Sequence, residues 1–388
     1  MLGASLPRHK VNQMEKEYLS ATHSAFDATL REQTIFDNII HRPSSARPAI
    51  LQSLKVLIPA KGLAYALLAL YRQQVNCGFV LADPLNPTGK ESKVFLDPHT
   101  GIEFQVMWNP DRELRGNREL LIERGVMAPK VDKEKLIHRD RDGRACFLCA
   151  HNIAFQNPAE ILLPMQLGGK AYYAGANFAY LANNHFTVMS AEHHSQEYGP
   201  QILAAMTDLV NRTDGHFRAI FNGLGAGASI PWHEHLQITT EPFPIEHIRI
   251  RPSDVVRSLG NVQVSTPFYY LSVWTVEGRS SQAVEHEAHR IAARWHRADP
   301  AHHTLNIIAT KQNEAFRLFL FPRDSRKRAG TGKAGTMASY ECGGTLILSY
   351  IPKPGQPNQT NERKTFDAAT LETVKALLAQ IAPPRRAA

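Results

Sequence analysis

The stretch Trp232-His233-Glu234-His235-Leu236-Gln237-Ile238 says more about fold and function than any other part of this sequence. Its residues alternate with the two-residue period of a β-strand, which places His233, His235 and Gln237 on one face. Two imidazoles and an amide on one strand face suit a nucleophile that attacks phosphorus, because the phosphoryl oxygens need hydrogen-bond donors nearby. A pair of half-buried strand histidines explains the same pattern equally well, so the pattern alone leaves both interpretations open.

A glycine-rich loop precedes this strand. It runs Gly223-Leu224-Gly225-Ala226-Gly227-Ala228-Ser229 and follows a strand-like segment at 217–222. Backbone N–H groups in such a loop can bind phosphate oxygens. The glycine spacing differs from the Gly-x-Gly-x-x-Gly motif of dinucleotide-binding folds, and the loop leads into a strand instead of a helix. We therefore reject a Rossmann-type site.

A Cys-x-x-Cys motif lies upstream, at Cys146 and Cys149. Such a pair is half of a zinc site, a redox pair or two buried small residues. Imidazoles that would complete a zinc site are present in Glu192-His193-His194 and at His233. His193 is preferred to His194 because it keeps the register of His185-Phe186-Thr187. The expected ligands of a structural zinc ion are Cys146, Cys149, His193 and His233.

The rest of the chain alternates between helical and strand-like patterns. Apolar residues at helical spacing predict helices over 15–40, 48–76 with an interruption at 59–62, 200–211, 281–297 and 368–381. Short β-type runs predict strands at 79–81, 93–96, 104–108, 180–181, 185–189, 217–222, 232–238, 269–276, 305–310, 316–321 and 345–351. His286-Glu287-Ala288-His289 lacks the spacing of a zinc protease, and we expect it on a solvated helix face.

This order predicts an α+β fold in which an antiparallel sheet with helices on one face occurs twice. The first segment, 1–140, is expected to be an N-terminal helical extension with a β-hairpin. The segment 141–250 is expected to be the first half of the duplicated fold and to carry the catalytic motif. The segment 251–388 is expected to be the second half. The charge-rich stretch 111–144 is expected to be a linker or an exposed crossing segment.

Composition excludes several other classes of protein. The chain has 388 residues, a net charge of +8, 43% hydrophobic residues and 4 cysteines, which is ordinary for a globular protein and excludes disordered, collagen-like and disulfide-scaffold classes. No apolar run approaches the ~20 residues that span a bilayer, so no membrane is expected. The first residues lack the apolar segment of a secretory signal, which predicts a cytoplasmic location. The charge excess is mild, and phosphorylated small molecules fit it as well as nucleic acid does.

The combined motifs resemble those of a known family. Arg144-Ala145-Cys146-Phe147-Leu148-Cys149-Ala150, then His193, then Asn222…Ser229…His233-x-His235-x-Gln237 resembles the galactose-1-phosphate uridylyltransferase branch of the histidine-triad superfamily. Relatives in that branch are the diadenosine tetraphosphate phosphorylases and the GDP-hexose phosphorylases. Compared with the uridylyltransferase pattern, one extra residue lies between Ser229 and His235. The cysteines are preceded by the motif Phe104-Gln105-Val106-Met107-Trp108-Asn109-Pro110. Both features resemble a bacterial subgroup of the family.

This resemblance implies roles for individual residues. His235 resembles the nucleophile that forms a covalent nucleotidyl-histidine, and Gln237 resembles the amide that hydrogen-bonds the phosphoryl group. Candidate substrate-binding residues are Asn222, Gly227, Ser229 and Arg323. Arg323 begins a basic loop that either clamps substrate phosphates or is simply solvated. The resemblance also implies a structural zinc ion and a histidine-triad-like sheet in each half of the fold.

The function that we predict is nucleotidyl transfer or phosphorolysis on a nucleotide-sugar or a dinucleoside polyphosphate. The partners would be that substrate and a phosphate-bearing acceptor, with the chain acting as a monomer or homodimer. Two alternatives stay open at this point. One is a histidine-triad-type nucleotide hydrolase, in which water is the acceptor. The other is a non-catalytic, zinc-stabilised nucleic-acid-binding protein, whose binding would fall steeply with salt.

Overall fold

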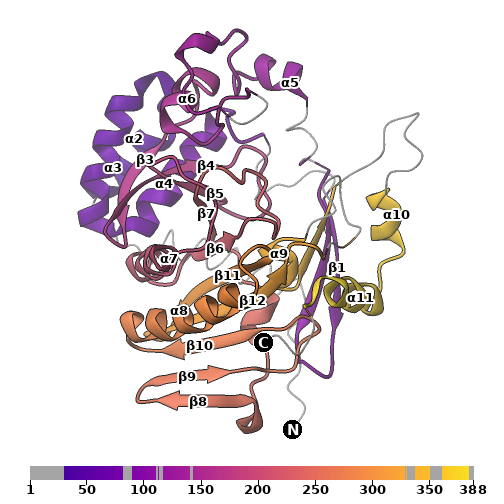
Figure 1. Cartoon of the computed structure of the whole chain (residues 1–388). Helices are drawn as coiled ribbons and strands as arrows, with labels where there is room; N and C mark the ends of the chain where they lie inside the picture. The colour runs from indigo at the N-terminus through magenta and orange to yellow at the C-terminus, as the bar shows by residue number, and fades with distance from the viewer. Residues whose placement is uncertain are drawn as a thin grey trace.

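A computed structural model describes residues 30–81, 90–110, 112, 117–139, 143–327, 329, 337–349 and 361–383 (Figure 1). The fold is α+β, as the sequence predicts. Its main feature is an antiparallel sheet of ten strands in the order β3-β4-β5-β7-β6-β11-β12-β10-β9-β8, and β1, β2 and β13 form a second sheet. The predicted helix at 15–40 is described only from Leu30, and residues 350 and 351 of the last predicted strand lie outside the described residues.

The described strands are β1 Glu91–Leu96, β2 Glu103–Trp108, β3 Leu163–Leu167, β4 Lys170–Ala176, β5 Phe186–Ser190, β6 Arg218–Asn222, β7 His235–Thr239, β8 Val255–Leu259, β9 Val262–Ser265, β10 Trp274–Gly278, β11 His303–Gln312, β12 Ala315–Asp324 and β13 Thr345–Leu348. The described α-helices are α2 Leu30–Ile40, α3 Arg47–Lys61, α4 Leu63–Asn76, α5 Arg118–Glu123, α6 Ala150–Gln156, α7 Pro200–Arg212, α8 Ser281–Ala298, α9 Ser339–Cys342, α10 Glu362–Asp367 and α11 Leu371–Ile381.

The ten-stranded sheet consists of two halves with the same order of elements. In the first half the sheet order is β3-β4-β5-β7-β6, with α7 between β5 and β6 in the chain. In the second half the order is β8-β9-β10-β12-β11, with α8 between β10 and β11. The halves join through antiparallel pairing of β6 with β11, which sets Asn222 opposite Asn306. The duplication therefore builds one continuous sheet. The domain boundaries near 140 and 250 stay a prediction.

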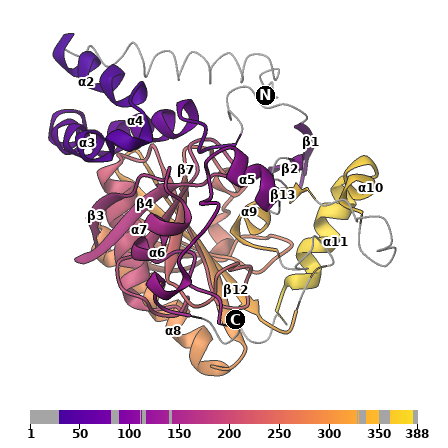
Figure 2. The ribbon, with the colours of Figure 1, turned by 90° about the horizontal axis from the view of Figure 1, so that it is seen from above.

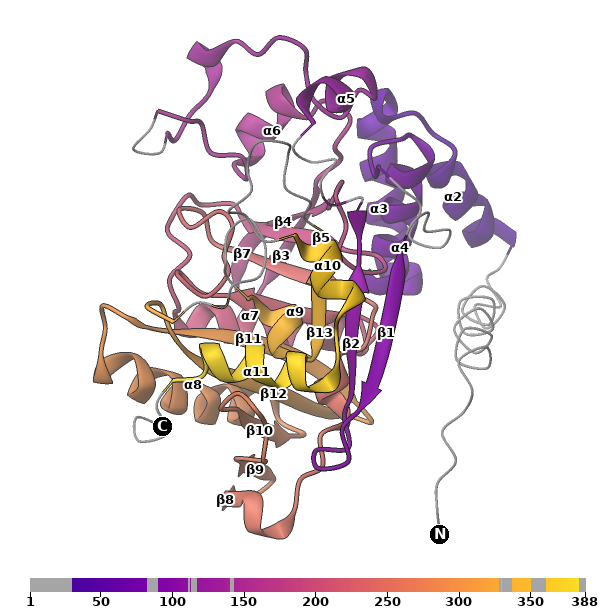
Figure 3. The same ribbon diagram turned by 90° about the vertical axis from the view of Figure 1, so that its right-hand side faces the viewer.

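The two faces of this sheet are covered by different parts of the chain. On one face α7 and α8 pack side by side, and α4 joins them in a single apolar core that includes Leu236 and Ile238 of β7. On the other face a second core contains Ile220, Ile308 and side chains from β2, β13, α9 and α11. Figure 3 shows the small sheet with α10 and α11 on this second side. In Figure 2 the N-terminal helices and the C-terminal helices lie on opposite sides of the molecule.

Two predicted strands, at 79–81 and 180–181, are wrong because their backbone groups are used elsewhere, and two others begin later than predicted. At 79–81 the N–H of Val80 donates to Gln74 O and that of Leu81 to Phe178 O, so no ladder forms. At 180–181 the N–H of Leu181 donates to a histidine ring. The segment before Trp274 alternates like a strand, but its buried side chains fill the second core from a loop. The strand predicted from 232 begins only at His235.

Candidate active site and metal centre

The motif that begins β7 divides its side chains between the two sheet faces. Leu236 and Ile238 belong to the helix-covered core, and Glu234 accepts hydrogen bonds from Tyr172 of β4 and Gln201 of α7. His235 and Gln237 therefore point to the opposite face, as strand geometry requires. Their strand pairs with β5 on one side and β6 on the other, so both side chains sit near the middle of the sheet.

Four side chains that are distant in sequence meet just before β7. Cys146, Cys149, His193 and His233 place one potential ligand atom each within 4.8 Å of one another. His233 Nδ1 lies 3.3 Å from Cys146 Sγ, 3.6 Å from Cys149 Sγ and 3.3 Å from His193 Nδ1. His193 Nδ1 lies 3.3 Å from Cys149 Sγ. These are the four residues that the sequence predicts as zinc ligands.

Four of the six spacings match the edges of a tetrahedral zinc site, and all six lie within 4.8 Å. With ordinary zinc bond lengths, the edges of the tetrahedron are about 3.4 Å between two nitrogens and about 3.6 Å between nitrogen and sulfur. The orientation of His233 fits as well, because its Nε2–H donates to Ser190 O at 2.9 Å and leaves the Nδ1 lone pair toward the cluster. Burial lowers the pKa of His233 to about 4, so the ring is neutral at pH 7 and can act as a ligand.

The two adjacent histidines after β5 have different positions. His193 is in the cluster, whereas His194 turns toward the buried carboxylate of Glu234, with Nδ1 3.7 Å from Oε2. A further histidine, His138, was not singled out by sequence. Its Nδ1 lies 3.3 Å from Cys149 Sγ, and its ring stacks on that of His193 at a centroid distance of 4.2 Å. His138 thus packs beside the cluster and restricts the orientation of His193.

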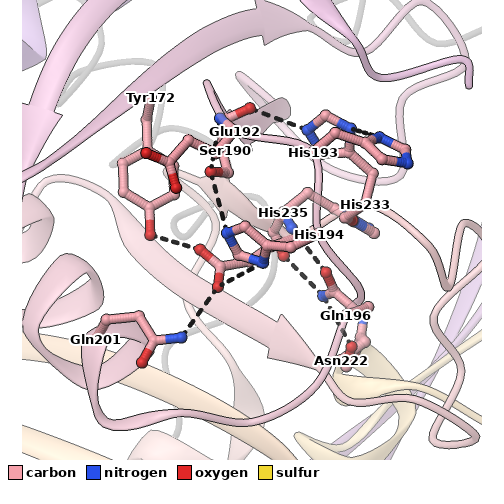
Figure 4. Close-up of polar contacts among 11 residues, drawn as sticks. Tyr172, Ser190, Glu192, His193, His194, Gln196, Gln201, Asn222, His233 and His235 are labelled. Atoms are coloured by element: carbon pink, nitrogen blue, oxygen red, sulfur yellow. Dashed lines mark hydrogen bonds and ion pairs between the residues drawn. The ribbon is translucent and has the colours of Figure 1, made fainter. Parts of the chain in front are cut away.

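The ring of His235 is oriented by one backbone carbonyl, and a glutamine side chain holds its backbone. Its Nδ1 lies 2.8 Å from the backbone oxygen of His233; a carbonyl can only accept, so Nδ1 carries the proton. The Nε2 lone pair is then available, and among the described residues no partner occupies it. Burial lowers the pKa of His235, which favours the neutral and nucleophilic ring. Gln196 secures this part of β7, because its side chain bonds both the N–H and the C=O of His235 and the C=O of Asn222 (Figure 4).

Gln237 is oriented by a histidine from the start of β5. The N–H of Leu181 donates to His185 Nδ1 at 3.2 Å, so the ring proton must be on Nε2. His185 Nε2 then donates to Gln237 Oε1 at 3.1 Å. Burial lowers the pKa of His185 to about 3, which keeps the ring neutral and the tautomer fixed. As a result the amide NH₂ of Gln237 is directed away from His185 and can donate to a ligand.

Asn222 at the end of β6 is held in the same way. Its Oδ1 accepts from the backbone N–H of Ser339 at 2.8 Å, from Ser339 Oγ at 2.7 Å and from Asn306 Nδ2 at 2.9 Å. The backbone donor fixes which end of the amide is oxygen, so the Asn222 NH₂ faces away from Ser339. Two amide donors, those of Asn222 and Gln237, thus lie on the same sheet face as His235.

The other candidate substrate-binding residues occupy different places. Arg323 is 1% exposed, and its Nη1 donates to Asn306 Oδ1 and to Met337 O. It lies behind Asn306 and acts on Asn222 through that residue. Gly227 has φ +92°, and a Cβ there would meet Ala338 Cβ at 2.6 Å, so the glycine lets the loop approach the start of α9. Ser229 is exposed in the same loop.

Comparison with known proteins gives a family of undescribed function and several similar solved structures. Residues 100–240 match the family model described as "Domain of unknown function (DUF4922)". No curated protein matches the chain. Among solved structures, yeast Ap4A phosphorylase Apa2 in complex with AMP shares 17% identity, with a TM-score of 0.47, over 81% of this chain and 97% of that chain.

Two other solved structures are similar over about half of this chain. A uridylyltransferase shares 13% identity over 50% of this chain and 74% of its own, with a TM-score of 0.27. A DUF4931 family protein from Bacillus cereus shares 12% identity over 54% of this chain and 94% of its own, with a TM-score of 0.29. The match to the family model covers both cysteines, both expected histidine ligands, His235 and Gln237, so the segment that builds this site is similar to the DUF4922 domain.

Proposed function

We propose that the chain is a nucleotidyltransferase or phosphorylase that works through a covalent nucleotidyl-histidine on His235. The observation that supports this most is the arrangement of His235 itself, with Nδ1 bound to the His233 carbonyl and Nε2 without a described partner. A histidine that served only as a buried strand residue would have no need of two oriented amide donors on its own face. Asn222 and Gln237 provide those donors.

In the first step of the proposed reaction, the Nε2 lone pair of His235 attacks the α-phosphorus of the nucleotide substrate. The P–N bond forms, the bond to the departing phosphate or sugar phosphate breaks, and that group leaves with the electron pair. The Nδ1–H bond to the His233 carbonyl stabilises the positive charge that develops on the ring. The NH₂ groups of Gln237 and Asn222 donate to the phosphoryl oxygens, whose negative charge is concentrated in the transition state.

In the second step an oxygen of the acceptor phosphate attacks the same phosphorus. The P–N bond breaks and its electron pair returns to Nε2, which restores the neutral ring. An inorganic phosphate acceptor makes the reaction a phosphorolysis, and a sugar phosphate makes it a nucleotidyl transfer. Both give ping-pong kinetics, because the first product leaves before the acceptor reacts.

We propose zinc as the resident metal and Cys146, Cys149, His193 and His233 as its ligands. The ion would be structural, since two thiolates and two imidazoles complete its tetrahedral coordination. It would link the start of α6 to the segment after β5 and to His233, which lies two residues before β7. By fixing His233, it also fixes the carbonyl that orients His235.

The test is to incubate the chain with each nucleoside triphosphate, with sugar nucleotides and with diadenosine tetraphosphate, each without an acceptor. We expect one substrate class to leave a nucleotidyl adduct on His235, detected by mass spectrometry. Adding inorganic phosphate or a sugar phosphate should discharge that adduct faster than water does. Discharge by water alone at the same rate would favour hydrolysis, and salt-sensitive nucleic-acid binding without any adduct would favour the non-catalytic alternative.

A further inference from the structure

A cavity of about 700 Å³ opens in the second half of the fold, away from the site already described. Residues from β8, β9, the start of β10 and α8 line it, among them Val264, Ile291 and Trp295 of the helix-covered core. The lining also includes Tyr269, Leu271 and Val273 of the second core, so the two sites are separated by their distance along the sheet. Strand β10 is four strands from β7, or roughly 19 Å at ordinary strand spacing. The cavity is therefore separate from the proposed active site.

The cavity occupies a place that is filled in the other half of the duplicated fold. In the first half α4 packs on β4 and shares the apolar core of this face with α7. In the second half, within the part of the chain that the structure describes, nothing takes the corresponding position beside α8 over β9. The helix and the edge hairpin β8–β9 instead bound an opening of a size that suits a small ligand.

Three arginines line this opening, and a buried carboxylate holds two of them. Arg257 of β8 and Arg290 of α8 both approach Glu287 Oε2 through their Nε atoms, at 3.8 and 3.0 Å. The Glu287 side chain is 7% exposed, whereas those of Arg257 and Arg290 are 42% and 41% exposed. Since contact is made through Nε, the terminal nitrogens of both guanidinium groups are available, and none has a partner among the described residues.

The third arginine, Arg294, lies one helical turn beyond Arg290 and has no hydrogen-bond or ion-pair partner in the described part of the chain. The single acidic lining residue, Asp254, accepts the backbone N–H of Arg251 through Oδ2. Paired guanidinium ends in fixed positions bind phosphate oxygens well. The sequence-based expectation that Glu287 lies on a solvated helix face is wrong, because Glu287 is buried between these two arginines.

Aromatic rings form the remaining wall. Phe268 is 46% exposed at the rim and Trp274 lines the interior, whereas Trp295 is only 2% exposed and stacks its ring on His303. A ligand that combines a phosphate with a flat ring would use both parts of this surface, with the phosphate on the arginines and the ring against the aromatic side chains. We propose that this cavity is a second binding site for a nucleoside 5′-phosphate, distinct from the site around His235.

The test measures equilibrium binding of AMP, GMP, CMP and UMP to the full chain by titration calorimetry, with adenosine and inorganic phosphate as partial ligands. The informative variant is Arg294→Glu, because Arg294 is exposed and its replacement breaks no described contact. Arg297→Glu is the matched control, since it makes the same charge change on the same helix outside the cavity. An azido derivative of the tightest nucleotide, photo-crosslinked and mapped by mass spectrometry, locates the site.

We expect a nucleotide-binding event that Arg294→Glu weakens at least tenfold and Arg297→Glu changes less than twofold, with crosslinks in 254–274 or in α8. Adenosine and phosphate should each bind at least tenfold more weakly than the nucleotide. The proposal is overturned by the absence of any binding that depends on Arg294, or by phosphate binding as tightly as the nucleotide. Adduct formation on His235, measured on the same Arg294→Glu protein, separately reports the proposed catalytic function.

Discussion

His185 Nε2 lies 3.1 Å from Gln237 Oε1, and the N–H of Leu181 on the other ring nitrogen fixes the direction of that hydrogen bond. A neutral histidine and a glutamine each have one donor end and one acceptor end, so these two side chains alone would allow the hydrogen bond in either direction. The N–H of Leu181 fixes the tautomer of His185 and, through it, the orientation of the Gln237 amide. The orientation of the proposed phosphate-binding amide is thus set by a residue that need not touch the substrate.

Two substitutions of His185 separate its two hydrogen bonds. His185→Gln keeps a donor near the Nε2 position and should retain turnover within about threefold. His185→Asn keeps an acceptor near the Nδ1 position but loses the donor to Gln237, and should lower turnover by about 10²-fold, as loss of one oxyanion donor does. Steady-state kinetics of the two variants is the measurement. Equal activities would mean that His185 has only a packing role.

Gln237→Ala should also lower turnover by about 10²-fold while the fold survives. The double variant His185→Asn/Gln237→Ala should be no slower than Gln237→Ala, because both changes remove the same contact. Turnover numbers and circular dichroism of the three proteins test this. Wild-type turnover in Gln237→Ala would remove the role that we assign to the amide.

Protein purified without a histidine tag should contain one zinc ion per chain. Cys149→Ser and His233→Ala should lose the metal and melt at a lower temperature, because the ion joins segments that have no other covalent or metal link. His194→Ala serves as the control and should keep its zinc, since His194 lies beside Glu234 and outside the cluster. Elemental analysis measures the zinc content of the wild type and of these variants. Stoichiometric zinc in Cys149→Ser, or its loss in His194→Ala, contradicts the ligand set.

Glu160 predicts a pH dependence of stability. Burial raises the pKa of its carboxyl to about 7, although Asn157 Nδ2 donates a hydrogen bond to it. The guanidinium of Arg47 donates to the backbone oxygens of Pro158 and Glu160. Between the ordinary pKa of glutamate and 7, the folded state binds a proton that the unfolded state lacks. Stability due to this group is therefore lost as the pH rises through that range.

Glu160→Gln removes this titration. From pH 5 to pH 8 the wild type should lose about 2 kcal/mol more unfolding free energy than the variant does. Urea denaturation of both proteins at the two pH values gives the comparison. Parallel pH profiles would show that the carboxyl titrates normally in the folded chain.

Sequence patterns predict the fold class and much of the site, for reasons that the structure makes plain. Alternation and the two strong helices α7 and α8 indicate a repeated sheet, although the strand patterns miss β3, β4, β8 and β9. The cluster of Cys146, Cys149, His193 and His233 follows from ligand types that rarely occur together by chance. The sequence marks His185 only as part of a strand, because nothing local shows that its ring will accept the N–H of Leu181. The burial of Glu287 is equally invisible, since it depends on Arg257 from a distant strand.

The sequence also left the position of Arg323 undecided between a phosphate clamp and a solvated loop. The structure places it in neither, buried behind Asn306. The reason is its position on β12, where alternation aligns Arg323 with Phe319 and Phe321 toward the second core. This buried position depends on contacts with Asn306 and Met337, which a local motif cannot show. The residues that are hardest to predict are those whose partners lie on other elements of the fold.

The most direct measurement is the site of the covalent adduct. Zinc would occupy the Nδ1 lone pair of His233, whose other nitrogen is bound to the Ser190 carbonyl, whereas Nε2 of His235 has no described partner. After reaction with the substrate nucleotide and no acceptor, mass spectrometry should locate a phosphoramidate on His235. His235→Ala should abolish it with zinc content and melting temperature nearly unchanged. An adduct mapped to His233, or one that persists in His235→Ala, would contradict the assignment of His235 as the nucleophile.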